Sequence, residues 1–117
     1  MTPALKGVRC ADVADLASWT PDDDEICLWL DLSIGPPDGE ATDLFKVCIA
    51  SRLGLKSARA PKGDAQARPI VLREYSWGAV LGAIRNRLDS CGGADWPEVQ
   101  QKLRRQFDSA DENHKSP

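Results

Sequence analysis

The feature that most constrains the fold is a strict alternation of hydrophobic side chains between residues 25 and 34. The apolar set is Ile26, Leu28, Leu30, Leu32 and Ile34, and the positions between hold Cys27, Trp29, Asp31 and Ser33. Successive side chains of a β-strand point to opposite faces, so a period of two predicts a strand with one buried face. The set that contains Trp29 is expected on the opposite face.

A second strand follows a strong turn signal. Residues 35–39 read Gly-Pro-Pro-Asp-Gly and end the first strand, because proline lacks a backbone donor and glycine permits positive φ. Phe45, Val47 and Ile49 then alternate with other side chains. The two segments predict a hairpin with a loop of several residues, which brings Cys27 and Cys48 near each other.

Further strands and irregular segments flank this hairpin. Residues 5–10 and 69–75 each predict one more strand, and residues 51–55 one short helical turn begun by Ser51. Residues 12–24 predict an acidic loop, with a turn of helix as an alternative around 12–17. Residues 56–68 predict a loop that is long for a compact domain.

Two helices are predicted near the C-terminal end. The first begins after the capping residue Ser76, and glycines 92 and 93 end it. The second begins after Asp95 and carries Glu98 where a capping box has its acid. The expected buried residues are Val80, Leu81, Ile84 and Leu88 in the first helix, and Trp96, Val99, Leu103 and Phe107 in the second.

Strands followed by helices indicate an α+β fold. We expect an antiparallel sheet of about four strands with two C-terminal helices packed on one face. The length of 117 residues fits a single domain, placed at residues 1–108, with residues 109–117 as a flexible tail. The start of the chain lacks a signal-peptide pattern and no segment is apolar enough to cross a membrane, so we expect a cytoplasmic protein with four free thiols.

Residues for catalysis or metal binding are scarce. The single histidine, His114, falls in the expected tail, where nothing would orient it for catalysis. The cysteines lie 17, 21 and 43 positions apart, without the close pairs of a zinc site. No glycine-rich phosphate-binding loop occurs. The sequence therefore predicts no enzymatic activity, no metal and no cofactor.

The charges are distributed unevenly. Residues 1–50 hold ten acidic and three basic residues, whereas residues 51–117 hold eight acidic and twelve basic ones. The densest acidic cluster consists of Asp22, Asp23, Asp24 and Glu25. Its alternative roles are acid–base chemistry, cation binding, contact with a partner, or no role beyond that of a solvated loop. The basic residues of the two helices either contact phosphate or form exposed helix faces; they are Arg85, Arg87, Lys102, Arg104 and Arg105. The pI of about 5.1 argues against a nucleic-acid partner.

Trp29 is the strongest single indication of a binding surface, because indole side chains recur at the centre of interfaces. The alternative is that a loop or a helix covers Trp29. Trp19, Trp77 and Trp96 stand near the starts of elements, where we expect them to pack against the core.

Several segments together resemble the immunity protein 8 family of bacterial polymorphic toxin systems. The matching segments are residues 13–16, 21–24, 34–36, 45–48, 69–77, 91–99 and 102–105. The chain departs from the family pattern at residues 50–55 and 108–112. The resemblance implies a protein that binds a toxin tightly and carries no catalytic residue.

The expected function is therefore an immunity protein that neutralises a cognate toxin by stoichiometric protein–protein interaction, without nucleic acid or membrane as a partner. The predicted contact residues are Asp22, Asp23, Asp24, Glu25, Trp29, Asp31, Asp38, Glu40 and Asp43. When free, the chain is expected to be a monomer or a weak homodimer. The alternative function is a self-associating structural or regulatory module that pairs through an exposed sheet edge.

Overall fold

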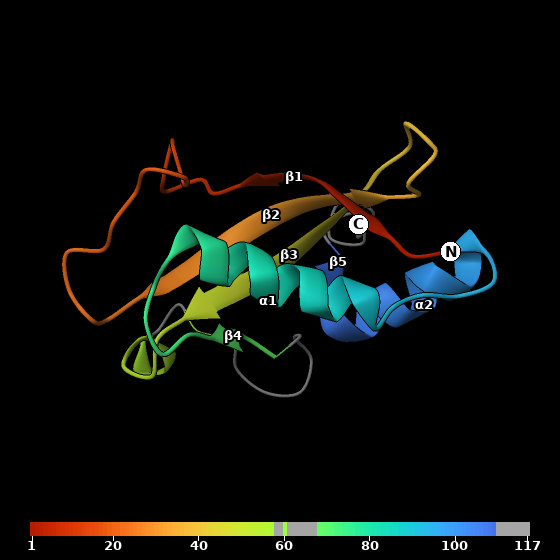
Figure 1. Ribbon diagram of the computed structural model, residues 1–117. Helices are drawn as coiled ribbons and strands as arrows, with labels where there is room; N and C mark the ends of the chain where they lie inside the picture. The colour runs from red at the N-terminus through yellow and green to blue at the C-terminus, as the bar shows by residue number, and fades with distance from the viewer. Residues whose placement is uncertain (58–59, 61–67, 110–117) are drawn as a thin grey trace, which may run out of the picture.

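The computed structural model describes residues 1–57, 60 and 68–109 (Figure 1). The strands are β1 (Ala4–Arg9), β2 (Cys27–Gly35), β3 (Asp43–Ala50), β4 (Ile70–Val71) and β5 (Asp108–Ser109). A 3₁₀ helix, η1 (Gly54–Lys56), follows β3, and the α-helices are α1 (Trp77–Asp89) and α2 (Trp96–Gln106).

The predicted hairpin forms the centre of the sheet. β2 and β3 pair antiparallel over eight positions, from Cys27 opposite Ala50 to Ile34 opposite Asp43. β1 pairs antiparallel with β2, and its register shifts between Leu5 and Gly7. The strand order β1-β2-β3-β4 and the two C-terminal helices confirm the predicted α+β class.

The outer edge of β3 differs in detail from the prediction. β4 contains two residues instead of the seven predicted, and it pairs with β3 in parallel, so the sheet is mixed. β5 pairs antiparallel with the other half of β3, which places Ser109 opposite Phe45 in the sheet. The remainder of the predicted tail, residues 110–117, lies outside the described residues, as do 58–59 and 61–67 of the predicted long loop. Residues 12–17 form turns and no helix.

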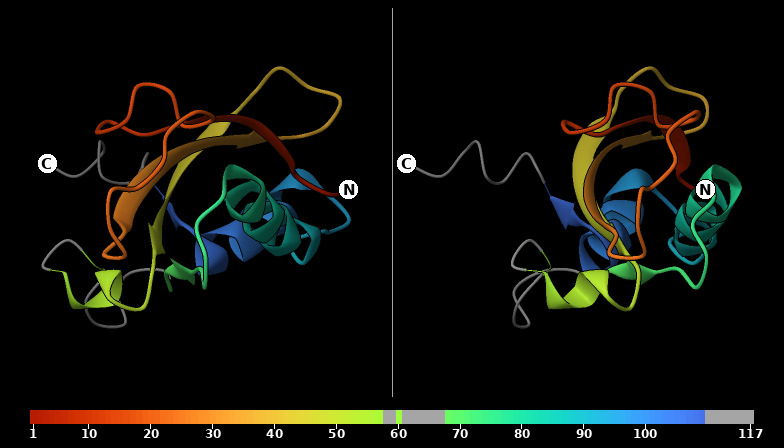
Figure 2. Two further views of the ribbon diagram at one scale, coloured as in Figure 1. Left: turned by 60° about the vertical axis from the view of Figure 1, so that its left-hand side comes forward. Right: turned by 90° about the vertical axis from the view of Figure 1, so that its left-hand side faces the viewer.

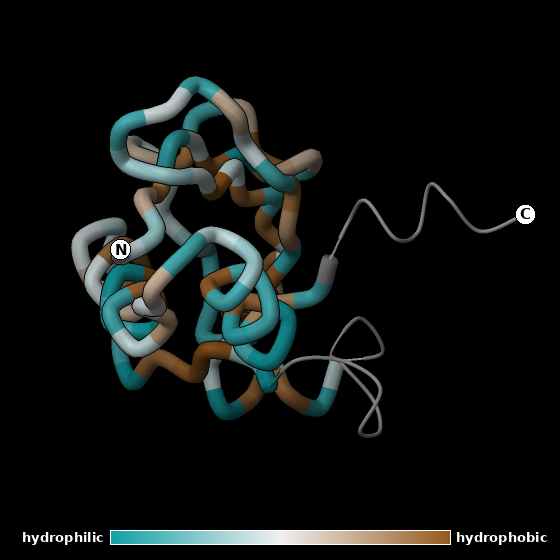
Figure 3. The backbone as a smooth tube through the Cα atoms, turned by 90° about the vertical axis from the view of Figure 1, so that its right-hand side faces the viewer, coloured by the Kyte–Doolittle hydropathy of each residue, from teal (hydrophilic) through white to brown (hydrophobic). Residues whose placement is uncertain are grey.

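The sheet curls around the helices, which lie on its concave side (Figure 2). Leu30, Leu32 and Ile34 of β2 join Val80 and Ile84 of α1 in one buried cluster. α2 contributes Val99 and Leu103, and Phe107 follows the helix; none of these three side chains is exposed. The alternation read from the sequence therefore separates a core face from an outer face. Figure 3 shows hydrophobic residues in brown and hydrophilic ones in teal along the backbone.

Both α-helices begin at the predicted caps. The Ser76 hydroxyl accepts a hydrogen bond from the amide of Ala79 at 3.0 Å, and the Asp95 carboxylate accepts one from Glu98 at 3.0 Å. These bonds satisfy amides that have no partner inside the first turn. α1 ends at Asp89, earlier than the predicted Gly92-Gly93 stop, with Ser90 as its C-terminal cap.

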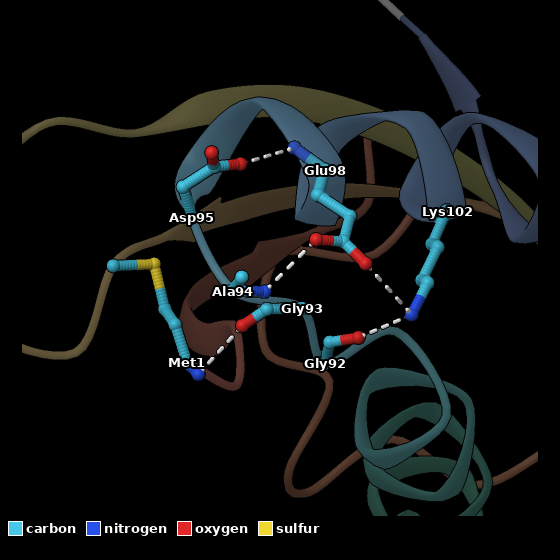
Figure 4. Close-up of polar contacts among 7 residues, drawn as sticks. All are labelled: Met1, Gly92, Gly93, Ala94, Asp95, Glu98 and Lys102. Carbon is cyan, nitrogen blue, oxygen red and sulfur yellow. Dashed lines mark hydrogen bonds and ion pairs between the residues drawn. The ribbon is translucent and has the colours of Figure 1, made fainter.

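Polar contacts also fix the turn between the helices (Figure 4). Glu98 accepts from the amide of Ala94 at 3.0 Å, one residue before the position that a capping box uses. Lys102 lies 3.7 Å from the same carboxylate and donates to the carbonyl of Gly92. This network ties the first turns of α2 to the segment that joins the two helices.

Candidate partner-binding surface

The four predicted acidic residues lie together in an exposed loop directly before β2, here called the acidic loop (residues 22–25). Ser51 attaches this loop to the end of β3. Its hydroxyl donates to the carbonyl of Asp24 and accepts from the amide of Ile26 at 3.0 Å, and the Ser51 amide donates to the carbonyl of Ile26 at 3.0 Å. Within the loop, the Asp23 carboxylate accepts from the amide of Glu25 at 2.9 Å.

Gly54 allows the next segment to approach the loop closely. A Cβ at Gly54 would stand 1.6 Å from the carbonyl oxygen of Ile26, a distance that no side chain tolerates. Its amide donates to the Ser51 hydroxyl at 3.0 Å, so Ser51 holds the turn that precedes η1. The helix itself spans Gly54–Lys56 with Leu53 at its N-cap, later than the predicted turn at 51–55. Glycine is required here for space, because backbone packs directly against backbone.

A groove of about 770 Å³ opens between the acidic loop, the segment after β3 and the segment around β4. The lining residues are Pro21, Asp23, Asp24, Ile26, Ser51, Arg52, Leu53, Val71, Leu72, Arg73, Glu74 and Tyr75. Leu53 and Val71 are 50% and 46% exposed, and Leu55 nearby in η1 is 40% exposed. Large apolar side chains left in water beside a groove are typical of a surface that a partner covers.

Tyr75 also lines this groove. Its ring meets the indole of Trp19 edge-on, with ring centroids 5.0 Å apart. Its buried hydroxyl has no hydrogen-bond partner among the described residues. Burial, and then the nearby Cys10 thiol, raise the pKa of Tyr75 above its ordinary value of 10.0.

Trp29 lies on the outer face of the sheet, half-buried and opposite Cys48. Asp31 on the same face stands between two cations, opposite Arg9 in β1 and opposite Lys46 in β3. The nearest oxygen of Asp31 is 3.9 Å from the Lys46 amine. The middle of β2 therefore presents an aromatic ring and a row of two cations around one carboxylate, not an acidic surface.

The remaining predicted contact residues lie at the far end of β2. Asp38 and Glu40 are exposed in the loop that joins β2 to β3, at the opposite end of the sheet from the acidic loop (Figure 1). Asp43 accepts a hydrogen bond from Gln100 of α2 at 2.6 Å. At roughly 3.3 Å per residue, β2 separates the two acidic ends by about 26 Å. The structure thus divides the nine predicted residues into three groups.

The sequence did not indicate the apolar lining of the groove or the role of Arg87. The Arg87 guanidinium donates to the carbonyls of Gln106 at 2.8 Å and Pro69 at 3.3 Å, and it lies 5.9 Å from the centre of the Phe107 ring. Burial, and then Arg68, lower the pKa of Arg87. Arg87 therefore joins α1 to both chain segments beside it instead of forming an exposed phosphate contact.

Metal-binding clusters and membrane-spanning helices are absent from residues 1–57, 60 and 68–109. No group of three or more histidine, cysteine, aspartate or glutamate side chains there is arranged to hold a metal ion. No helix in this part of the chain is both long and apolar enough to cross a membrane. His114 lies outside the described residues.

Comparison with known proteins agrees with the sequence resemblance. The chain matches the family model of immunity protein 8 over residues 3–110, which includes both helices and all the strands. No curated protein and no solved structure matches the chain. Because the family match spans nearly the whole domain, the chain belongs to the immunity protein 8 family.

Proposed function

We propose that this immunity protein neutralises its toxin by binding it one to one, with the acidic loop and the adjoining groove as the principal contact surface. One observation carries this choice of surface: Asp23 and Asp24 of the exposed acidic loop line a groove that also exposes Leu53 and Val71. Carboxylates steer a basic partner into encounter, and buried apolar contacts then lengthen the life of the complex.

The complement of this surface is a positively charged toxin face with an apolar side chain at its centre. The nucleic-acid groove of a nuclease has the required charge, because it must attract phosphate. Trp29 and Asp31 extend the contact along the outer face of β2, whereas Asp38, Glu40 and Asp43 lie about 26 Å away, near the limit of a standard interface.

The proposed activity is binding of the toxin and not catalysis, and the proposed compartment is the cytoplasm. The family assignment supports the first part, since an immunity protein acts on a toxin. The four free cysteines support the second, because the cytoplasm keeps thiols reduced.

The test begins with a pull-down of the tagged protein, co-expressed with the products of its neighbouring genes. Recovery of a one-to-one complex with a toxin domain supplies the partner for kinetic measurements. Two double variants are then compared: Asp22→Lys with Asp24→Lys in the acidic loop, and Asp38→Lys with Glu40→Lys at the far end. Both pairs make the same change in charge on exposed residues.

We expect the acidic-loop variant to associate with the toxin about tenfold more slowly at low salt, and with a weaker dependence on ionic strength. The far-end variant should retain most of the association rate. Val71→Ser should mainly raise the dissociation rate. Normal association by the acidic-loop variant, together with a slow far-end variant, would place the contact surface at the other end of β2.

A further inference from the structure

Two thiols meet on the outer face of the sheet, and neither belongs to the lining of the groove. Cys27 of β2 lies opposite Ala50, and Cys48 of β3 lies opposite Trp29, so the two cysteines are diagonal neighbours on one face. Their sulfur atoms are 3.6 Å apart. The contact depends on strand pairing, because 21 positions separate the two residues in the sequence.

The two thiols differ in their access to solvent. Cys27 is half-buried, whereas Cys48 is 1% exposed. A small oxidant therefore reaches Cys27 first, and Cys48 lies behind it at contact distance. A reactive thiol beside a resolving thiol is the arrangement that oxidation-sensitive cysteine pairs share.

The other two cysteines lack these properties. Cys10 and Cys91 belong to the hydrophobic core, at 8% and 0% exposure. The Cys91 thiol donates to the carbonyl of Arg87 at 3.2 Å. Burial raises the pKa of Cys91, which lowers its thiolate fraction. They serve as internal controls in the same molecule.

We propose that Cys27 and Cys48 form a site of reversible oxidation, at which hydrogen peroxide or another small hydroperoxide converts two thiols into a disulfide. The Cys27 thiolate attacks one peroxide oxygen, the O–O bond breaks, and water and a sulfenic acid result. The Cys48 thiolate then attacks the Cys27 sulfur, the S–O bond breaks, and a second water leaves. Two electrons and the two thiol protons pass to the oxidant, so hydrogen peroxide becomes two waters and an organic hydroperoxide becomes an alcohol and one water.

The position of the pair predicts a disulfide that is easily reduced again. The sulfur atoms must approach from 3.6 Å to a bond length of about 2.05 Å across a diagonal of the sheet. Diagonal neighbours stand farther apart than directly opposite residues, so closing the bond strains the hairpin. Strain raises the reduction potential of a disulfide, and glutathione should restore the dithiol.

The experiment uses the full chain, reduced and freed of reductant, then treated with hydrogen peroxide and blocked with N-ethylmaleimide. Digestion with trypsin and a glutamate-specific protease cuts after Glu25 and Lys46 and so separates Cys10, Cys27 and Cys48 onto different peptides. Mass spectrometry should find the Cys27 and Cys48 peptides joined, with the loss of two hydrogen atoms, and Cys10 and Cys91 still alkylated. This mapping needs no variant and is unaffected by any folding defect.

Two variants assign the order of events. Cys48→Ser should leave Cys27 as a sulfenic acid that dimedone traps, and Cys27→Ser should slow peroxide loss of the Cys48 thiol by about tenfold or more. Thermal melts of both variants confirm that they fold. Oxidation of Cys10 or Cys91 before the pair, disulfides only between molecules, or unchanged thiols at Cys27 and Cys48 would each overturn the proposal.

Discussion

Tyr75 is the single tyrosine of the chain, so its ionisation can be followed without interference from another phenol. Burial and the nearby Cys10 raise its pKa in the folded protein, which means that folding favours the neutral phenol. The unfolded chain ionises first as the pH rises, and the contribution of Tyr75 to stability is full below pH 10 and declines above it.

We predict that the native protein shows a tyrosinate absorbance curve displaced to higher pH than the curve of the denatured protein. A spectrophotometric titration of both states measures the displacement, and tryptophan fluorescence reports whether the native state stays folded. Coincident curves would contradict the buried position of the hydroxyl.

Side chains that act within their own turn could be predicted from the sequence, and side chains that act across the fold could not. Ser76 and Asp95 cap helices that begin one residue later, so pattern and spacing identify them. Ser51 was predicted to start a helical turn and instead holds the turn before η1, whose N-cap is Leu53. Its bond to Ile26 spans 25 positions. Arg87 finds its partner Gln106 at a separation of 19 positions, which no local pattern records.

Among the elements, β4 shows how pairing limits a strand. Residues 69–75 have the apolar content of a strand, but β3 ends at Ala50 and offers partners only to Ile70 and Val71. The amide of Leu72 donates to the carbonyl of Ala50 at 2.9 Å, and the chain then turns toward α1. The length and direction of β4 therefore depend on its pairing with β3, which the sequence of residues 69–75 alone does not specify.

The same substitution should have opposite effects in two elements. Gly54→Ala forces a methyl group against the Ile26 carbonyl and should lower the free energy of unfolding by about 3 kcal/mol. Gly82→Ala in α1 meets no atom within 4 Å, and alanine favours helix, so it should raise that free energy by about 0.5–1 kcal/mol. Urea unfolding curves measure both. Similar losses from both substitutions would contradict the close approach at Gly54.

At the scale of the whole molecule, the edges of the sheet bear on self-association. β1 forms one edge, with exposed Lys6 and Arg9 and a register irregularity between Leu5 and Gly7. Charged side chains and bulges at an edge strand oppose pairing with a second copy. The other side of β3 is occupied by β4 and β5.

We therefore predict a monomer for the free protein across a wide concentration range. Sedimentation velocity at increasing concentration checks this, with Lys6→Val as the companion variant that removes an edge charge. A concentration-dependent dimer of the unaltered chain would favour the self-associating module over the immunity function.

The acidic part of the candidate surface could be predicted, because four consecutive carboxylates form one loop whatever the fold. The groove could not, since its lining comes from three separate segments that the sheet and Ser51 bring together. The acidic and basic halves of the sequence also do not form separate acidic and basic regions of the folded molecule. Arg52 and Arg73 from the basic half line the groove beside Asp23 and Asp24.

The attachment of the acidic loop has a consequence for how such proteins diversify. Its four carboxylates lie outside the core, and the Ser51 hydroxyl holds the loop by a hydrogen bond to the backbone carbonyl of Asp24. New side chains in the loop therefore cost little folding free energy. If the acidic loop contacts the toxin as proposed, a lineage that keeps its sheet and helices is free to exchange the loop as toxins change, and recognition then evolves faster than architecture.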